Sequence, residues 1–314
     1  MEFDINEVLF NRDYLQGLVS EYALKGLRMT PFFEPVSIDD DTFTWIKDDS
    51  NPEKAITAGQ QHKPRLLAEG AQLEEIRLEG YSTETGTMTK FGYRLTISNN
   101  LLKRRVVLGT LLDKIKKLAY GLGREIEEIT YTAAKAKAIS EGINNPSLSK
   151  TLIGGTESRV HEALLDLQVA YDLDDYSQEL DTLVMTKSDL AAVRKQLNAN
   201  EIITQNRIIE GWDARGFEYM DTTFMRSSMF QNNGELFGFD KNIPLGNIYY
   251  GIEDGAYNPS VVTGMEHIAP IINVTVQEPE SWNVPKEYTI RMLASVGIGI
   301  TSPQRILYSN NFKA

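Results

Sequence analysis

The sequence predicts an α+β fold in which one long helix follows an extended N-terminal part and precedes a mixed C-terminal half. Apolar residues recur at the 3.6-residue period of a helix from 108 to 129. They alternate with polar residues, as in a strand, from 91 to 98 and from 288 to 292. Short apolar pieces separated by Gly and Asn fill 202–258, which is typical of short strands and loops.

The N-terminal segment is expected to begin with a helix and to continue as an extended arm. Apolar residues recur near helical spacing from 6 to 25, and Gly26 follows as a stop signal. Residues 39–49 are acidic but include Trp45 and a second aromatic residue. Because such a stretch cannot bury much surface on itself, we expect an arm that lies on another surface.

Residues 72–98 are expected to form a β-hairpin. Ile76 and Leu78 alternate with charged residues, and 80–87 is rich in turn residues. The return strand places four apolar side chains on one face: Phe91, Tyr93, Leu95 and Ile97. A two-stranded ribbon is at best marginally stable alone in water. We therefore expect another copy of the chain to cover the apolar side of the ribbon, with packing on its own domain as the alternative.

The long helix is expected to begin at Asn99 or Asn100, whose side chains can cap it, and to end near Gly142. Glycine weakens a helix, so a kink or break near 121–123 is an open alternative to one continuous helix.

The C-terminal half is expected to mix helices and strands. A helix is predicted over 157–169 and a short strand over 183–185. Residues 186–189 read Thr-Lys-Ser-Asp, a capping box that opens the next helix. Further strands are predicted over 271–276 and 288–300.

The sequence offers no recognisable catalytic, cofactor-binding or metal-binding motif. Cysteine is absent, which excludes thiolate metal sites and cysteine nucleophiles. The three histidines lie about 100 residues apart, without the spacing of a helical zinc site. The aspartates in 172–175 lack the glycine and glutamate of a calcium loop. We expect no catalytic residue, no cofactor and no metal, so not an enzyme; an α/β enzyme with a composite site built from distant loops stays an alternative.

The charge and hydropathy patterns limit the partners. A net charge of −12 argues against a protein that grips phosphates tightly. No run of about 18 uncharged apolar residues and no N-terminal secretory signal is visible, so we expect no membrane partner and synthesis in the cytoplasm. The basic stretch 103–117 and the acidic stretch 157–181 could meet across a subunit interface or be two solvated faces.

The order of these elements resembles the major capsid proteins of tailed viruses of bacteria and archaea, the Hong Kong 97-like fold. That family runs through an N-arm, an E-loop hairpin, the spine helix of the P-domain, an A-domain and a return strand. Residues 42–46 are similar to the N-arm, and 67–70 with 91–98 are similar to the E-loop. Residues 99–102 resemble the entry to the spine helix, 182–186 the A-domain strand, and 287–303 the return strand. The likeness covers roughly 28–308 and depends on order and spacing, because no single motif is specific.

The resemblance implies five parts of the chain. They are an N-terminal helix and N-arm at 1–56, the E-loop with flanking strands at 57–98, the P-domain spine helix at 99–150, the A-domain at 151–270 and the return strands at 271–314. It also implies self-assembly into the pentamers and hexamers of an icosahedral shell. An encapsulin-like shell that encloses cargo protein is the nearest alternative.

The implied partners are other copies of the chain and packaged double-stranded DNA, held by weak non-specific contact. Portal, scaffold or decoration proteins are further possible partners. The implied location is the virion capsid, with assembly in the host cytoplasm.

The candidate subunit-interface residues lie on the arm and the ribbon. They are Trp45, Ile76, Arg77, Leu78, Lys90, Phe91, Tyr93 and Arg94. Replacing Phe91 and Tyr93 together by Ser is expected to weaken assembly more than folding of the monomer, because that face is expected to lie against a neighbour.

Overall fold

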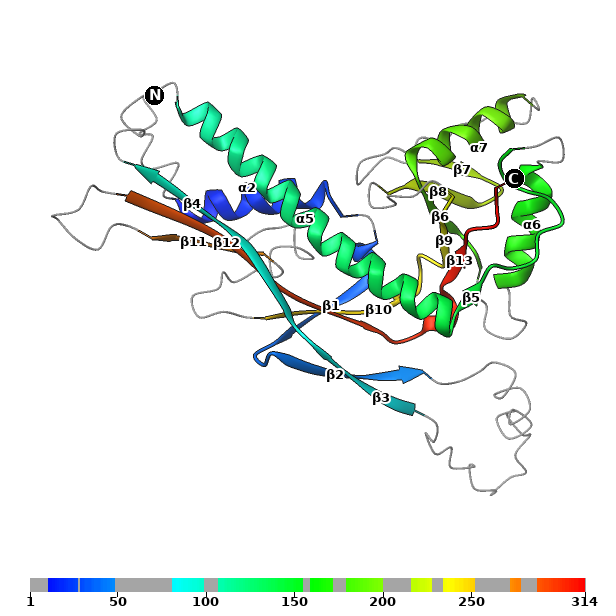
Figure 1. The fold of residues 1–314 in the computed structure, drawn as a ribbon, viewed down its shortest axis with the longest axis horizontal. Coiled ribbons are helices and arrows are strands. Elements are labelled where there is room, and N and C mark those ends of the chain that lie inside the picture. The colour runs from blue at the N-terminus through cyan, green and yellow to red at the C-terminus, as the bar shows by residue number, and fades with distance from the viewer. Residues whose placement is uncertain are drawn as a thin grey trace, which may run out of the picture.

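The longest element is a 34-residue helix, α5 (Val107–Ser140), which lies along one β-sheet and reaches a second sheet with its C-terminal end (Figure 1). The computed structural model describes residues 11–27, 29–48, 81–98, 107–154, 159–171, 179–199, 216–227, 234–251, 272–277 and 287–313. These ranges contain both helices and long runs of consecutive strands, within 33–98 and within 217–300, which confirms the predicted α+β class.

The first sheet is built around β12 (Glu287–Ile300). On one side, β4 (Thr89–Ser98) pairs antiparallel with residues 287–296. On the other side, β11 (Ile272–Gln277) and β10 (Gly246–Gly251) pair antiparallel with earlier and later parts of β12. The parallel strand β1 (Phe33–Ile38) extends the sheet beyond β10. The predicted C-terminal strands at 271–276 and 288–300 are thereby confirmed.

Two helices cover one face of this sheet. The shorter one, α2 (Arg12–Leu24), begins after Asn11, whose side-chain oxygen accepts a hydrogen bond from the N–H of Tyr14 at 3.1 Å. The helix predicted from 6 is therefore confirmed from Arg12, and 6–10 lie outside the described residues. The two helices and the sheet share one core. Its buried side chains include Leu15, Val19 and Ala23 of α2; Ile115, Leu122 and Ile126 of α5; and Ile248, Ile290, Met292 and Val296 of the sheet.

The helix α5 is continuous through 121–123, so the alternative of a break there is wrong. A Cβ added at Gly123 would lie 2.2 Å from the backbone oxygen of Ala23 on α2. A Cβ added at Gly26 would lie 3.0 Å from the backbone nitrogen of Arg124. These glycines let the two helices approach closely, which offsets their low helix propensity. The predicted start at Asn99 or Asn100 lies outside the described residues.

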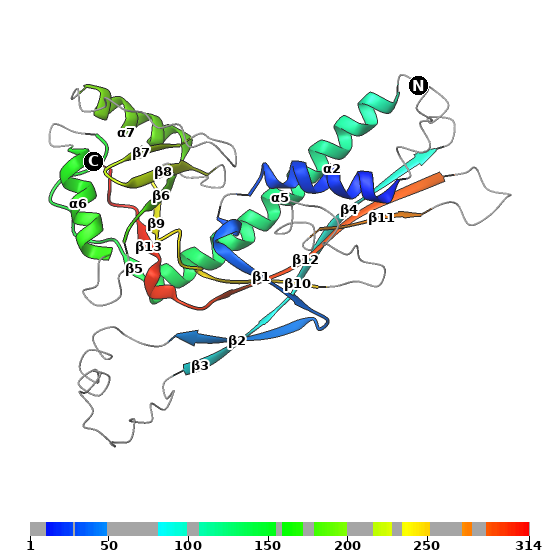
Figure 2. The same ribbon diagram turned by 180° about the vertical axis from the view of Figure 1, so that it is seen from behind.

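The second sheet has six short strands. In sheet order they are β5 (Ile143–Asn144), β13 (Leu307–Ser309), β9 (Leu236–Phe239), β6 (Thr182–Met185), β8 (Thr222–Arg226) and β7 (Phe217–Tyr219). All four residues of β6 are buried, as expected of a central strand with both faces covered. In Figure 2 this sheet and its helices form one end of the molecule, away from β4 and β11.

Two helices accompany the second sheet. They are α6 (Val160–Tyr171) and α7 (Lys187–Ala199), close to the predicted helices. The capping prediction at 186–189 is confirmed, because the N–H of Asp189 donates to the hydroxyl of Thr186 at 3.1 Å. The hydroxyl of Thr186 in turn donates to the Asp189 carboxylate at 2.8 Å.

A separate two-stranded ribbon consists of β2 (Thr42–Asp48) and β3 (Tyr81–Thr87), which pair antiparallel. The prediction that 80–87 forms a turn is wrong for the residues of β3. Its threonines alternate along the strand, and β-branched residues favour extended backbone. Only Met88 separates β3 from β4, so one long extended segment serves two sheets. The predicted partner strand at 76–79 lies outside the described residues.

Candidate functional site

The ribbon β2–β3 is connected to the first sheet where the chain passes from β1 to β2 and from β3 to β4 (Figure 1). We call these two connections the neck. The N–H of Met88 donates to the backbone oxygen of Asp41 at 2.8 Å. The ammonium of Lys90 lies 2.7 Å from the carboxylate of the same Asp41, but these side chains are 53% and 77% exposed. Such an exposed ion pair contributes little stability, so other contacts must set the direction of the ribbon.

The inner face of the ribbon carries an aromatic anchor, formed by Phe43 and Trp45. Phe43 stacks on Tyr249 of β10, with ring centroids 4.2 Å apart. The indole N–H of Trp45 donates to the backbone oxygen of Ile300 at 3.0 Å. Trp45 is only 8% exposed, so the surface on which the predicted arm lies belongs to its own chain.

Two glycines of β12 make room for the aromatic anchor. A Cβ at Gly297 would lie 2.1 Å from Phe43, and a Cβ at Gly299 would lie 2.8 Å from Trp45. Side chains at these positions would therefore keep the ribbon from crossing β12. The spacing of the glycines in Gly-Ile-Gly-Ile matches the period-two alternation of the strand and places both on the same face.

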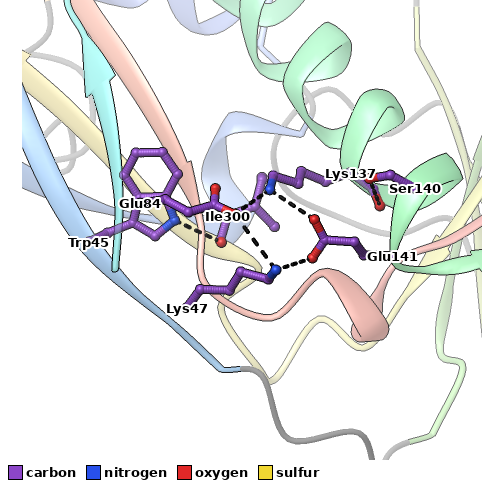
Figure 3. Close-up of polar contacts among 7 residues, drawn as sticks. All are labelled: Trp45, Lys47, Glu84, Lys137, Ser140, Glu141 and Ile300. Carbon is purple, nitrogen blue, oxygen red and sulfur yellow. Dashed lines mark hydrogen bonds and ion pairs between the residues drawn. The ribbon is translucent and has the colours of Figure 1, made fainter. Parts of the chain in front are cut away.

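The distal end of the ribbon is joined to α5 by four charged side chains (Figure 3). The ammonium of Lys137 lies 2.5 Å from Glu84 and 3.0 Å from Glu141. The ammonium of Lys47 forms an ion pair with Glu141 and lies 3.6 Å from Glu84. Each lysine thus contacts both glutamates, and we call this group the charge ring.

The ionisation of the charge ring follows from its mixed environment. Burial alone would raise the pKa of Glu141, but hydrogen bonds from Lys47 and Lys137 outweigh burial and lower its pKa. Burial alone would lower the pKa of Lys137, but hydrogen bonds to Glu84 and Glu141 raise it. Glu141 and Lys137 are therefore charged at neutral pH.

The outer face of the ribbon is exposed. Its exposed residues are Thr42, Thr44, Ile46, Thr83, Thr85 and Thr87. Ile46 is the large aliphatic side chain of this face and is 60% exposed. This face is the part of the ribbon that its own body leaves free for contact.

The return strand β4 shows the predicted alternation, but its own chain covers most of its apolar face. Ile97 is only 2% exposed, and Phe91 and Leu95 pack against the core beneath α5. A Cβ at Gly121 of α5 would lie 3.3 Å from the hydroxyl of Tyr93. The interpretation that only another copy can cover this side is therefore wrong for Phe91, Leu95 and Ile97, whereas Tyr93 remains 37% exposed.

The remaining interface candidates differ in position. Lys90 and Arg94 lie exposed on the opposite face of β4, where a neighbour could reach them. Ile76, Arg77 and Leu78 lie outside the described residues. No motif in the sequence indicates the charge ring, because Lys47, Glu84 and the pair Lys137 and Glu141 lie far apart in the chain.

A second polar cluster joins α5 to the second sheet. The carboxylate of Glu235 accepts hydrogen bonds from the hydroxyl of Tyr131 and from Lys135, the latter at 2.5 Å. The hydroxyl of Tyr308 on β13 also lies 3.3 Å from Glu235. Burial alone would raise the pKa of Glu235, but the hydrogen bonds from Lys135 and Tyr131 outweigh it and lower the pKa.

A buried carboxylate fixes the entry to β1. Glu127 of α5 is fully buried and accepts the N–H of Met29 at 2.8 Å and the N–H of Thr30 at 3.3 Å. The hydroxyl of Thr30 donates to the same carboxylate at 3.2 Å. The helical pattern of the sequence predicts only that Glu127 lies on the long helix and does not indicate this structural role.

The described residues contain no group of three or more His, Asp or Glu side chains placed to hold a metal ion. Within the same ranges, no helix is long and apolar enough to cross a membrane. The ring of His161 lies against the sulfur of Met220, with Nδ1 2.8 Å from Sδ. His62, His267 and the acidic stretch 172–175 fall outside the part of the chain that the structure describes.

No protein-family model and no curated protein sequence matches the chain. Solved structures do resemble it. The capsid structure of cyanophage P-SCSP1u has a TM-score of 0.51 at 8% identity and covers 90% of this chain and 86% of that chain. A structure from Microbacterium phage Oxtober96 has a TM-score of 0.52 at 11% identity, with 92% and 91% covered.

An encapsulin complex from Synechococcus elongatus is similar as well, with a TM-score of 0.54 at 6% identity and with 89% of this chain and 85% of that chain covered. At such identities the likeness concerns the fold alone. It extends over nearly the whole of each chain, and it agrees with the order of elements from the arm to the return strand. The chain therefore has the Hong Kong 97-like fold of tailed-virus capsid proteins.

Proposed function

We propose that this chain is a shell-forming subunit, the major capsid protein of a tailed virus, and that it has no catalytic role. The observation that carries the proposal is the likeness of fold, which spans 90% of this chain for a cyanophage capsid structure. The ribbon supports it, because its outer face is exposed while its inner face is fixed to the body. Copies would assemble into the pentamers and hexamers of an icosahedral shell.

The parts of the fold would then take the roles that the family order gives them. Residues 1–56 would be the N-terminal helix and N-arm, and β3 and β4 would belong to the E-loop part at 57–98. The spine helix α5 falls in 99–150, the second sheet largely in the A-domain at 151–270, and β12 among the return strands. The strand β10 lies in the A-domain range but pairs in the first sheet, so it would connect the two parts.

The contact surface with a neighbouring subunit would be the outer face of the ribbon together with the exposed side of β4. Thr44, Ile46, Lys90 and Arg94 are its exposed members. Trp45 and Phe91 would act indirectly, because they hold the ribbon and β4 on their own body, whereas Tyr93 is 37% exposed and could contact a neighbour directly. Assembly from one repeated subunit requires contacts that close into rings.

The second candidate is an encapsulin-like shell around cargo protein, and the encapsulin with a TM-score of 0.54 favours it. The contents of the particles separate the two. We expect particles purified from the natural source to contain double-stranded DNA that withstands added nuclease until the shell is opened. Particles that contain a cargo protein and no DNA would favour the encapsulin-like shell instead.

The net charge of −12 suits a wall that confines DNA without gripping it. The corresponding test is the affinity of dispersed subunits for duplex DNA at physiological salt, which we expect to be weak and independent of sequence. Tight sequence-specific binding by the dispersed subunit would contradict a confining wall. The virion capsid is the proposed location, with assembly in the host cytoplasm.

A further inference from the structure

The charge ring joins three separate pieces of chain at one point (Figure 3). Lys47 comes from β2, Glu84 from β3, and Lys137 and Glu141 from the end of α5 and the residue after it. The ring therefore fixes both strands of the ribbon to the helix. The strand β2 ends one residue after Lys47, and β3 begins three residues before Glu84. Both strands reach this end of the ribbon, where residues 49–80 connect them.

The ribbon is held along its length by contacts of different kinds. At the neck there are the Met88–Asp41 backbone hydrogen bond and an exposed ion pair. Next comes the aromatic anchor, in which Phe43 and Trp45 are at most 8% exposed. The charge ring is the contact at the distal end, two residues and about 7 Å beyond Trp45.

The charge ring differs from the aromatic anchor in its access to water. The side chains of Lys47, Lys137, Glu84 and Glu141 are 14%, 24%, 29% and 30% exposed. Water and salt ions reach these charges, so the separated groups can be solvated at once. Separating Phe43 and Trp45 from β10 and β12 would instead expose aromatic surface and a backbone oxygen.

We propose that the charge ring is a latch. When it is closed, it holds the distal end of the ribbon, at Lys47 and Glu84, on the end of α5. When it opens, the distal end swings away while the aromatic anchor stays in place as the pivot. The latch belongs to the single subunit, so it goes beyond the proposed function and does not depend on it.

The chain contains no cysteine, so two introduced cysteines can carry a pair of spin labels without interference. One label replaces Thr83 on the outer face of the distal ribbon, and the other replaces the exposed Glu128 of α5. The distance distribution between the labels is measured by pulsed electron paramagnetic resonance on the full chain. With the ring intact we expect one narrow distribution.

Lys137→Met and Glu141→Gln each remove charges from the ring. Each is expected to add a second population at a different distance and to raise the open fraction about fivefold. Raising salt from about 0.1 M to 1 M in the chain with the intact ring should act in the same direction, because the screening length falls from about 10 Å to 3 Å.

The matched control is Lys25→Met, which removes an exposed ion pair with Glu21 on α2, far from the ribbon in sequence. It should leave the distance distribution unchanged. The latch is disproved if the two ring variants and the salt series all give the distribution of the intact ring. Should a ring variant fail to fold, the salt series on the intact ring decides alone, since it changes no residue.

Discussion

The backbone oxygen of Ala23 on α2 occupies the place that a side chain on Gly123 of α5 would need, because a Cβ there would lie only 2.2 Å away. The two helices therefore touch backbone to backbone at this point. Both helices bury their apolar sides in the same core, so their separation also sets how they lie on the first sheet. The glycine that weakens α5 in isolation is thus required by the packing of the folded chain.

Gly123→Ala should destabilise the chain by about 1–3 kcal/mol, because the added methyl group forces α2 away from α5. Gly109→Ala is the matched control on the same helix, where a Cβ would meet no atom within 4 Å. It should raise stability by up to about 1 kcal/mol through helix propensity. Denaturant unfolding of dispersed subunits measures both, and equal effects of the two substitutions would contradict the close approach.

Trp45→Phe should cost about 1–3 kcal/mol, because it leaves the backbone oxygen of Ile300 buried without its hydrogen-bond donor. The neighbouring substitution Ile46→Thr changes a side chain that is 60% exposed and should stay within about 0.5 kcal/mol. Denaturant unfolding again gives the comparison. If Ile46→Thr proved the more harmful of the two, the assignment of inner and outer ribbon faces would be incorrect.

The Glu235 cluster should make the free energy of unfolding depend on pH. The pKa of Glu235 is lowered in the folded chain, so its charged form stabilises the fold above its ordinary pKa of 4.5. That contribution is lost as pH falls below 4.5 toward the lowered pKa. Glu235→Gln should therefore reduce stability at pH 7 and flatten the loss below about pH 4.5.

Unfolding free energies between about pH 3 and pH 7 test this prediction. Glu21→Gln, at an exposed ion pair, is the control. Its free energy of unfolding should change with pH as that of the unaltered chain does. If the free energy of unfolding of Glu235→Gln changed with pH as in the unaltered chain, the contact between α5 and the second sheet would not depend on the charge of Glu235.

The two faces of β4 should respond differently to substitution. Phe91→Ser removes a side chain packed on the core and should lower subunit stability by about 1–2 kcal/mol. Arg94→Ser alters the exposed face and should leave subunit stability within about 0.5 kcal/mol while weakening assembly. Light scattering during assembly, set beside unfolding of the dispersed chain, separates the two effects. Normal assembly by Arg94→Ser would remove this residue from the proposed contact surface.

Local patterns in the sequence predicted the elements whose environment is regular. The apolar stripe of α5 and the alternation in β12 each follow from one face of an element that meets one core. The cap at Thr186 was also predictable, because the hydrogen bond involved spans only three residues. In these cases the sequence neighbourhood and the folded environment agree.

The failures have a common physical origin in contacts between distant residues. Threonine and glycine in 80–87 resemble a turn locally, but pairing with β2 makes this segment a strand. The apolar face of β4 looks uncovered in the sequence, but Phe91, Leu95 and Ile97 pack on the core to which α5 and β12 also contribute. The charge ring brings together Lys47, Glu84 and Lys137, whose spacing in the sequence has no signature.

The most direct test of the account is electron microscopy of the purified chain under conditions that promote assembly. The account predicts closed shells of uniform diameter built from many copies of the 35.4 kDa chain, with pentamers and hexamers visible as capsomers. A chain that remains a dispersed monomer at high concentration across the tested conditions would contradict it.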